Sequence, residues 1–414
     1  MQLSVFTPTH NPRYLNDCYD SLAKQTMGDW EWIVLLNGDA PEWSPAREDD
    51  RVRVLRGETA IRGVGAAKRA ACEAATGDVL VELDHDDVLA AECLAEVAEA
   101  FSTNPDAVLV YSDFTQINED GSRNDKRFNQ AMGWVYDDVF VDGQWYLRCQ
   151  AMAPLPHNIG YIWYAPNHVR AFRRDAYERT GGYDASLDVL DDQDIMVRLY
   201  LEGEFVHLPR CLYLQRVHPG NTQVDPAVNA HIQQQTVNMY RESISGLTKA
   251  WARRNGLAML ALRTQTSPDE PVDPDLEIQT IKWSAPRIDA ADESVGMIVA
   301  SELLQRIPDR AALFNECYRV LPHGGLILTH TPSTDGRGAF QDPSHVAFYN
   351  ENSFQYLTQA NLRRSIPALN ARLQVSHQRT FHPTPWHEEL QIPYVDANLV
   401  AVKDGPRLGG PLLN

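Results

Sequence analysis

The sequence is short of several features that would assign it to a specialised class of protein. Its 414 residues contain no uninterrupted apolar run close to the roughly 20 residues that cross a bilayer as a helix. The first five residues, MQLSV, lead directly into an expected strand, without the basic region and apolar segment of a secretory signal. No internal repeat or low-complexity tract is present. We therefore expect a globular cytoplasmic protein that does not span a membrane.

Cysteine is sparse and is not arranged as a metal or disulfide motif. The six cysteines form no CxxC pair and lie far apart, at Cys18, Cys72, Cys93, Cys149, Cys211 and Cys317. This spacing suits neither a zinc knuckle nor a dense disulfide framework. A reducing compartment is the simplest interpretation.

Positive charge is also in deficit. The chain has 56 Asp and Glu against 37 Lys and Arg, a formal net charge of −19. Non-specific binding to nucleic acid depends on clustered Lys and Arg, so the composition argues against it and leaves only a local basic groove open. Hydrophobic residues make up 43% and aromatic residues 9%, which is enough to fill the cores of about two or three domains.

Short apolar strands alternate with amphipathic helical stretches in the first quarter of the chain. The strand signals are LSVFTPT, WEWIVLLNG, RVRVLRG and DVLVELD, with helices expected over 14–25, 65–75 and 90–101. This alternation predicts βαβ units and a mainly parallel sheet, and such sheets bind ligands at the carboxyl ends of their strands. The segments Thr7-Pro8-Thr9, Asn37-Gly38-Asp39 and Asp84-His85-Asp86 should therefore share one rim.

The second half of the chain contains a boundary and a smaller α/β pattern. A polar helical segment over 226–256 ends at a glycine, and SPDEPVDPD at 267–275 is typical of a linker. Beyond it come VGMIVA, a helix over 309–320, a Gly-rich turn and LILTHTP. We predict an α/β domain over 1–225, a helical connector over 226–265 and a smaller α/β domain over 276–405.

The strand that starts at Asp78 ends in an unusual acidic cluster, LDHDD, at residues 83–87. Mg²⁺ and Mn²⁺ characteristically bind through one or two carboxylates together with the phosphates of a substrate. Asp84 and Asp86 could therefore hold a nucleotide diphosphate at the strand end. The alternative is that these acids cap a helix starting near Val88, for which Asp87 is well placed.

Six ordered pieces of the chain resemble glycosyltransferase family 2 over residues 1–222. They are VFTPTHNP with SLAKQT, WEWIVLLNG, GVGAAKRAACEAATGDVLVELDHDD, RRDAYERTGGYD, LDDQDIMVRLYLEG and RVHPGN. The resemblance implies the GT-A fold, a nucleotide-sugar donor, an inverting reaction and a Mn²⁺ or Mg²⁺ ion. It assigns metal and donor binding to Asp84 and Asp86, and favours Asp86 as the direct metal ligand.

A second acidic cluster, Asp191-Asp192-Gln193-Asp194, matches the E-D-x-D position of that family. Inverting transfer needs a base on the face opposite the leaving group, and the resemblance assigns this role to Asp192. Asp191, placed near the acceptor, replaces the more common Glu. For Asp194 we favour first-turn charge at the helix start, and Arg198 either pairs with an acid of the site or with a surface carboxylate.

Several other residues gain roles from the resemblance. His218 in RVHPGN is expected to help hold the metal or diphosphate, with a structural loop histidine as the alternative. Arg216 is a candidate for diphosphate contact. Lys68 lies where relatives often have an Arg near the nucleotide, although a surface lysine is an equal interpretation.

The donor and acceptor contacts are less specific. Many relatives end the second strand with two Asp residues, whereas this chain has Leu36 and Asn37, so UDP-sugar is favoured and GDP- or TDP-sugar stays open. Gly182 suits a tight backbone near a sugar, or an ordinary turn. Trp163 belongs to aromatic-rich, irregular segments over 132–172 that could stack on an acceptor, although buried packing is the usual explanation.

The segment DESVGMIVASELLQRIPDRAALFNECYRVLPHGGLILTHTP resembles the later half of class I methyltransferases, over about 276–360. We expect the first strand and its Gly-rich loop to be missing, because no G-x-G-x-G occurs between 257 and 285. The prediction is a domain that does not methylate and serves packing, oligomerisation or acceptor presentation. The stretch GRGAFQDPSHVAFYNENSF could be a binding loop or a hydrogen-bonded structural loop.

The sequence thus predicts a metal-dependent, inverting hexosyltransferase that moves a sugar from a nucleotide-diphosphate sugar to an acceptor hydroxyl. The acceptor could be a glycan, a small metabolite or a modified DNA base, and the negative charge disfavours the last. Two rivals stay open: a catalytically decayed nucleotide-sugar-binding scaffold, and a bifunctional glycosyltransferase and methyltransferase. A homo-oligomer is also open.

Overall fold

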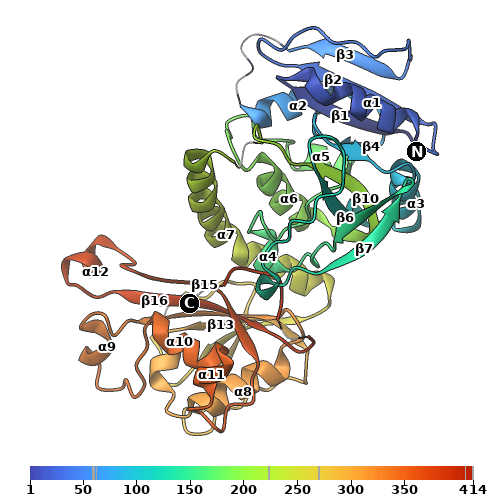
Figure 1. The fold of residues 1–414 in the computed structure, drawn as a ribbon. Helices are drawn as coiled ribbons and strands as arrows, with labels where there is room; N and C mark the ends of the chain where they lie inside the picture. Colours follow the sequence, from blue (N-terminus) through green and yellow to red (C-terminus); the bar gives the residue numbers. More distant parts are fainter. Residues whose placement is uncertain (58–60, 62, 222–223, 269–270, 406, 413–414) are drawn as a thin grey trace. The chain divides into compact units, whose positions relative to one another are not determined.

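The computed structural model describes residues 1–57, 61, 63–221, 224–268, 271–405 and 407–412. The chain forms two compact units (Figure 1). Unit 1 comprises Met1–Pro154 and Asn158–Ser243, and unit 2 comprises Leu155–His157 and Ile244–Asn414. Within the described ranges, none of the helices combines the length and the apolar character that crossing a membrane requires.

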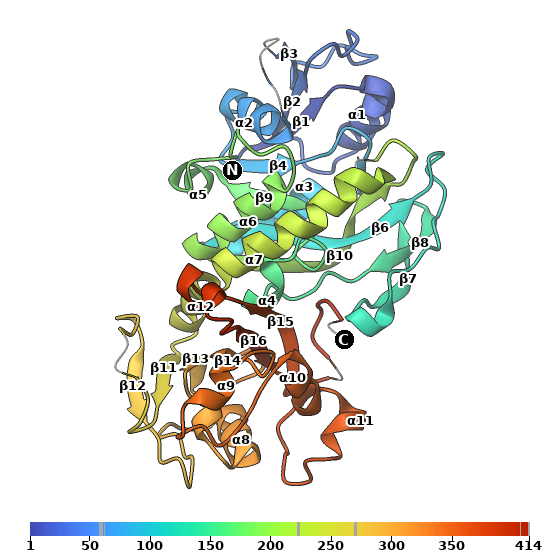
Figure 2. The same ribbon diagram turned by 90° about the vertical axis from the view of Figure 1, so that its left-hand side faces the viewer.

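Unit 1 is built on one sheet with the strand order β3-β2-β1-β4-β9-β6-β10-β5. Its strands are β1 (Leu3–Thr9), β2 (Trp30–Leu36), β3 (Val52–Arg56), β4 (Val79–Glu82), β5 (Val88–Leu89), β6 (Ala107–Ile117), β9 (Arg170–Arg173) and β10 (Glu204–Arg216). The first four strands in the sheet order are parallel, whereas β9 is antiparallel to both β4 and β6. A hairpin of β7 (Tyr136–Val141) and β8 (Gln144–Cys149) pairs with the end of β6 (Figure 2).

Burial explains why these sequences form strands between helices. Every residue of β2, β4 and β6 is buried, as expected for strands covered on both faces. The helices of unit 1 are α1 (Leu15–Ala23), α2 (Val64–Ala74), α3 (Cys93–Thr103), α5 (Arg174–Arg179) and α6 (Asp191–Glu202), with the short α4 (Pro156–Ile159) at the division of the units. One apolar core joins α2 and α6 to Phe6, Leu80 and Phe172 of the sheet.

The register of the parallel strands positions the candidate site. Leu3 pairs with Trp30 of β2 and with Val79 of β4, so the three strands run in step and their carboxyl ends meet at one edge. The predicted α/β class with a mainly parallel sheet in this region is confirmed.

The long helix α7 (Pro226–Arg254) runs through the division between the units, which falls between Ser243 and Ile244. The sequence pattern predicted this helix as part of a separate connector. Its first half belongs to unit 1, where Tyr240 stacks on Tyr161 with ring centroids 4.4 Å apart.

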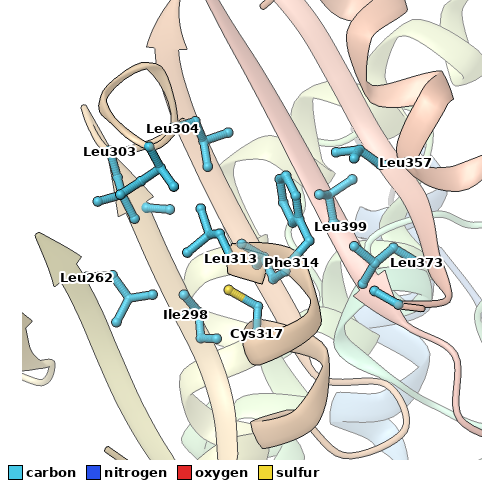
Figure 3. Close-up of a cluster of buried hydrophobic side chains, with 14 of the residues drawn as sticks. Leu262, Ile298, Leu303, Leu304, Leu313, Phe314, Cys317, Leu357, Leu373 and Leu399 are labelled. Carbon is cyan, nitrogen blue, oxygen red and sulfur yellow. The ribbon is translucent and has the colours of Figure 1, made fainter. Parts of the chain in front are cut away.

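Unit 2 has a sheet in the order β12-β11-β13-β14-β16-β15. Its strands are β11 (Ala258–Arg263), β12 (Glu277–Thr280), β13 (Val295–Ser301), β14 (Leu326–Pro332), β15 (Leu373–Phe381) and β16 (Tyr394–Ala401), and its helices are α8 (Arg310–Val320), α9 (Gly338–Gln341), α10 (Glu351–Thr358), α11 (Ala360–Arg363) and α12 (Pro385–Glu389). Leu313, Phe314 and Cys317 of α8 face Ile298 and Leu399 of the sheet in a buried apolar cluster (Figure 3).

One prediction for unit 2 is wrong. The first strand is present, because β11 pairs in parallel with both β12 and β13. It was missed since a run of six residues directly after Gly256 is too short to separate from a helix end by periodicity. The predicted lack of a Gly-rich loop still holds, as no glycine occurs between Leu257 and Val295.

Candidate active site

The acidic residues that follow β4 form a loop that the end of β10 holds in place. Arg216, the last residue of β10, donates from Nε to the carbonyl of Asp86 at 2.8 Å and from its backbone N–H to Asp87 Oδ1 at 2.7 Å. The nearest helix, α3, begins only at Cys93. The alternative that these acids cap a helix near Val88 is therefore wrong, and the expected helix over 90–101 starts later than predicted.

Asp86 of this loop contacts His218, which follows β10 and is far away in sequence. The two residues have 12% exposed side chains, and His218 Nε2 lies 2.9 Å from Asp86 Oδ2. Asn221 donates to the same carboxylate oxygen at 3.1 Å. An imidazole nitrogen and a carboxylate oxygen on a partly accessible loop fit the ligands expected for Mn²⁺, and a carboxylate also suits Mg²⁺.

A second group of potential ligands lies nearby. Among the residues that the structure describes, one oxygen each of Glu82 and Asp84 and one nitrogen of His168 lie within 4.8 Å of one another. Arg170 already donates to both Glu82 oxygens, and its Nη2 lies 2.8 Å from His168 Nε2, which must accept because a guanidinium only donates. The Asp86–His218 pair therefore fits a cation better.

Glu82 is the centre of a buried charge network behind the strand end. Lys68 of α2 lies 2.6 Å from its Oε1, Arg170 forms a two-pronged contact at 2.8 and 2.9 Å, and Tyr183 donates to Oε2 at 3.2 Å. Burial alone would raise the pKa of Glu82, but Arg170 and Lys68 hold it at about 2. Glu82 is therefore ionised and joins α2, β4 and β9.

The second acidic cluster forms the first turn of α6 and is tied to the same network. Lys68 Nζ lies 2.8 Å from Asp191 Oδ2, and Arg170 Nη1 donates to Asp192 Oδ2 at 3.2 Å. Burial raises the pKa of Asp191 against the opposing charge of Lys68, and the neighbouring Asp192 adds to the rise, giving about 6. Asp191 is buried, whereas the Asp192 side chain is 23% exposed and can meet a ligand.

The other charged residues of α6 serve the helix itself. Arg198 donates from Nε to Asp194 Oδ2 at 3.1 Å, and its Nη1 donates to the carbonyls of Thr180 and Gly182. Asp194 is thus a first-turn acid, as favoured from the sequence, and Arg198 pairs with that acid instead of with Asp191 or Asp192.

Among the predicted donor contacts on β1 and after β2, Thr7 lies deeper in the sheet than the others. Thr7 is fully buried, donates to the carbonyl of Leu83 at 2.7 Å and accepts from Trp32 Nε1 at 2.9 Å. Its side chain joins β1 to β2 and to the segment after β4, and donor contact by Thr7 stays a prediction.

The other predicted donor contacts, Pro8, Thr9 and Asn37, lie at or directly after the ends of β1 and β2. Thr9 is buried and accepts from the backbone N–H of Asn11, Pro8 is half-buried, and Asn37 follows β2 with its backbone N–H bound to the carbonyl of Thr9. Asn37 Oδ1 is buried, and no hydrogen-bond partner for it lies among the residues that the structure describes. Donor contact by Pro8, Thr9 and Asn37 stays a prediction.

Two predicted donor-binding cations lie beneath the surface. Lys68 is buried between Glu82 and Asp191, which excludes the surface-lysine interpretation. Arg216 is also buried, and its guanidinium contacts Asp17 and the carbonyls of Asp86 and Glu119. Both side chains are held by ion pairs or hydrogen bonds within the protein, and direct contact with the donor stays a prediction for each.

The predicted acceptor side includes Gly182 and Trp163. Gly182 has φ +74°, and a Cβ there would lie 2.8 Å from the Tyr177 hydroxyl, so the local structure by itself accounts for a glycine here. Trp163 is half-buried, and its Nε1 has no hydrogen-bond partner within the described ranges. Gln193, next to Asp192, donates to the carbonyl of Gly160 in the same loop. An acceptor role for Gly182, Trp163 and Asp191 stays a prediction.

Three residues of the network were missed by the sequence interpretation: Glu82, His168 and Arg170. A signal existed, because Glu82 and Arg170 each stand between two apolar residues in the sequence, and charged residues are rarely buried unless paired. Their partnership was not readable, since it depends on β9 lying antiparallel beside β4.

Two family models match parts of the chain. Residues 4–181 match the family model for glycosyl transferase family 2. This match lies within unit 1, whose mainly parallel sheet agrees with the GT-A fold expected from the resemblance. Residues 255–329 match a methyltransferase domain model, which starts earlier than the resemblance over 276–360 and includes β11. Both predicted resemblances are confirmed.

Curated relatives of the chain are distant. The O-antigen biosynthesis protein RfbC of Myxococcus xanthus is 27% identical over 208 residues, which is 48% of this chain and 14% of that protein. The chondroitin synthase of Pasteurella multocida is 24% identical over 228 residues, 54% of this chain and 21% of that protein. The chain thus spans less than a quarter of the length of these relatives.

Solved structures similar to the chain include glycosyltransferases. S. aureus TarS 1-349 in complex with UDP-GlcNAc is 16% identical with a TM-score of 0.43, covering 62% of this chain and 72% of that one. The mannosyltransferase PcManGT from Pyrobaculum calidifontis, in complex with GDP-Man and Mn²⁺, is 15% identical with a TM-score of 0.39, covering 63% and 76%.

Proposed function

We propose that unit 1 is a metal-dependent, inverting glycosyltransferase that moves a hexose from a nucleotide-diphosphate sugar to an acceptor hydroxyl. The observation that carries the proposal is the position of Asp192 at the first turn of α6, tied through Arg170 and Glu82 to the strand that delivers Asp86. One acid is thus available for the leaving group and another, on a separate element, for the attacking hydroxyl.

The proposed roles divide between the two acids. Asp86 and His218 would hold a Mn²⁺ or Mg²⁺ ion. Such an ion, when bound, supplies positive charge to the diphosphate as it leaves. Asp192 would accept the proton of the acceptor hydroxyl as its oxygen attacks the anomeric carbon from the opposite face. Arg216 keeps the Asp86 loop in place through the Asp86 carbonyl.

A UDP-sugar is the favoured donor, and GDP- or TDP-sugar stays open. The names of the similar structures include UDP-GlcNAc and GDP-Man, so they support a nucleotide sugar without selecting the base. Asn37 can donate and accept at a base edge, and its Oδ1 has no hydrogen-bond partner in the described part of the chain. The names of the curated relatives favour a glycan acceptor, and the net charge of −19 disfavours a modified DNA base.

For unit 2 we propose a role without methyl transfer, in packing, oligomerisation or acceptor presentation within a cytoplasmic protein. The rival is a bifunctional enzyme, which is favoured by the methyltransferase match and by a cavity of about 270 Å³ at the ends of β11 and β13, lined by Arg263, Ser301 and Glu302 among others. The lack of a glycine between Leu257 and Val295 argues against it, because the cofactor needs close backbone approach.

Turnover with water as the acceptor tests the proposal without knowledge of the natural acceptor. The protein is incubated with UDP-glucose, UDP-GlcNAc or GDP-mannose and Mn²⁺, and release of UDP or GDP is followed. We expect slow release from one donor that requires the metal and falls by about 10²-fold or more in Asp192→Asn. Metal-dependent nucleotide binding with no turnover of any donor would instead favour the decayed scaffold.

A further inference from the structure

Arg170 makes four contacts, and three of them would suffice for a structural role. Its Nε and Nη2 donate to the two carboxylate oxygens of Glu82, and Nη2 also contacts His168 Nε2. The fourth contact is different, because Nη1 donates at 3.2 Å to Asp192, which lies on another element and is partly exposed.

The fold fixes the guanidinium before it reaches Asp192. Arg170 faces Glu82 directly across the antiparallel pair of β9 and β4, and both side chains are almost fully buried. A two-pronged contact with a carboxylate fixes the plane of a guanidinium as well as its position. The remaining Nη1 therefore has a defined direction, set by β4.

From this geometry we infer that Arg170 is a positioning residue for Asp192, which transmits the placement of β4 and its Asp84–Asp86 loop to the acid on α6. The inference rests on the proposed function, since it concerns the acid proposed as the base. A base is effective only within hydrogen-bond reach of the proton it removes. A shift of about 1 Å in a reacting group can lower a rate by about 100-fold.

Lysine cannot replace this arrangement. An ammonium group is a point charge on a flexible stem and lacks the planar fork that holds Glu82 while a third nitrogen points elsewhere. Arg170→Lys should therefore keep the charge opposite Glu82 and lose the direction toward Asp192. Lys68 illustrates this difference. Its Nζ contacts both Glu82 and Asp191, but among the described residues it makes no contact with Asp192.

The test compares Arg170→Lys with Arg173→Lys in the full-length protein. Arg173 lies on the same strand, donates to the carbonyls of Phe101, Asn104 and Ala107 and lies over the Phe101 ring, and it forms no ion pair with a carboxylate among the described residues, so it is a matched control. The assay is release of nucleotide from the donor that the wild type hydrolyses, with water as the acceptor. UDP or GDP binding in Mn²⁺ is measured by calorimetry in parallel.

We expect Arg170→Lys to lower kcat by about 10- to 100-fold while nucleotide affinity changes by less than about threefold. In the Asp192→Asn background, Arg170→Lys should have no further effect, because the two residues act as one unit. Arg173→Lys should retain wild-type kcat. A merely structural role would lower the melting temperature without this split between kcat and binding.

If Arg170→Lys does not fold, the double variant Arg170→Gln/Glu82→Gln is measured in its place. This variant removes both members of the ion pair and therefore leaves no unpaired buried charge. The same fall in kcat is expected. A folded variant at Arg170 with wild-type kcat overturns the inference but not the proposed function. The same holds if Arg170→Lys lowers kcat equally in the wild-type and Asp192→Asn backgrounds. A wild type that binds the nucleotide but turns over no donor overturns the proposed function, and the inference with it.

Discussion

His218 Nε2 lies 2.9 Å from Asp86 Oδ2, across 132 residues of sequence. The contact joins the loop after β4 to the loop after β10, and the carboxylate oxygen it uses also accepts from Asn221. Two side chains that suit a transition-metal ion are therefore held together by the fold, independently of any nucleotide.

The first prediction concerns metal-dependent binding. His218→Ala removes one ligand of the proposed ion, so we expect UDP affinity in Mn²⁺ to fall by about 10- to 100-fold, and affinity without metal to change little. His231→Ala, at an exposed position on α7, is the control and should bind as the wild type does. Titration calorimetry measures both. Equal UDP binding by His218→Ala and the wild type in Mn²⁺ would remove His218 from the metal site.

The second prediction concerns the base. Asp192→Asn keeps the size of the side chain and removes its ability to take a proton, so donor turnover should fall by about 10²- to 10⁴-fold. Asp194→Asn, in the same helical turn, breaks only the pair with Arg198 and should keep turnover within about threefold of the wild type. Both variants should bind UDP normally. If the Asp194 variant loses turnover and the Asp192 variant does not, the roles assigned to the two acids are reversed.

The third prediction is a pH dependence of stability that originates in Asp191. Its pKa is about 6 in the folded protein against an ordinary value of 3.8. Between these values the folded state binds a proton that the unfolded state has released. Asp191 therefore lowers the free energy of unfolding as pH rises from about 4 to 6, by on the order of 2 kcal/mol.

Asp191→Asn removes this titration and keeps the side-chain shape. The difference in melting temperature between variant and wild type should therefore move in favour of the variant as pH rises from 4 to 7. The contribution of Glu82, whose pKa is about 2, changes in the opposite direction, because it stabilises the fold less as pH falls. This contribution is common to both proteins and cancels in the comparison. A difference that is independent of pH would mean that Asp191 titrates normally.

The fourth prediction separates two reasons for the glycine pair before Tyr183. Gly181 and Gly182 both have positive φ, but a Cβ at Gly181 meets nothing within 4 Å, whereas one at Gly182 meets Tyr177 at 2.8 Å. Gly181→Ala should cost about 1 kcal/mol of stability from backbone strain alone, and Gly182→Ala about 2–4 kcal/mol because the clash is added. Urea unfolding measures both. Equal losses would show that Tyr177 yields to the extra methyl group.

The fifth prediction concerns unit 2. The segment after β11 supplies no glycine for close approach to a cofactor, so S-adenosylmethionine should show no saturable binding at concentrations up to about 1 mM, the weak end of specific affinities. The bifunctional rival predicts saturation. Calorimetric titration decides between them, and saturation that is abolished by Glu302→Ala at the cavity would support that rival.

Much of the site could be predicted from the sequence because its residues end strands. In a parallel sheet, carboxyl ends share an edge, so the placement of Thr9, Asn37 and the acids after β4 near one another follows from alternating strands and helices. The choice between a metal-binding loop and a helix cap did not follow from local sequence. It depended on where α3 begins, and helix starts are the least certain feature of a pattern.

The charge network could not be predicted, because it depends on β9, which is antiparallel to its neighbours in a mainly parallel sheet. Arg170 reaches Glu82 and Asp192 only since β9 enters the sheet antiparallel between β4 and β6. The resemblance placed Lys68 near the nucleotide, with a surface lysine as the alternative, and neither predicted that two buried carboxylates hold this lysine inside the protein. Strand β11 was missed for a simpler reason, the shortness of its apolar run.

Titration calorimetry of the full-length protein with UDP, GDP, TDP and CDP, each with and without Mn²⁺, tests the central claim most directly when Asp86→Asn is measured beside the wild type. The account predicts that one nucleotide, UDP in first place, binds the wild type in a metal-dependent manner and that Asp86→Asn loses this dependence. No binding of any nucleotide by the folded wild type, with or without metal, would contradict it.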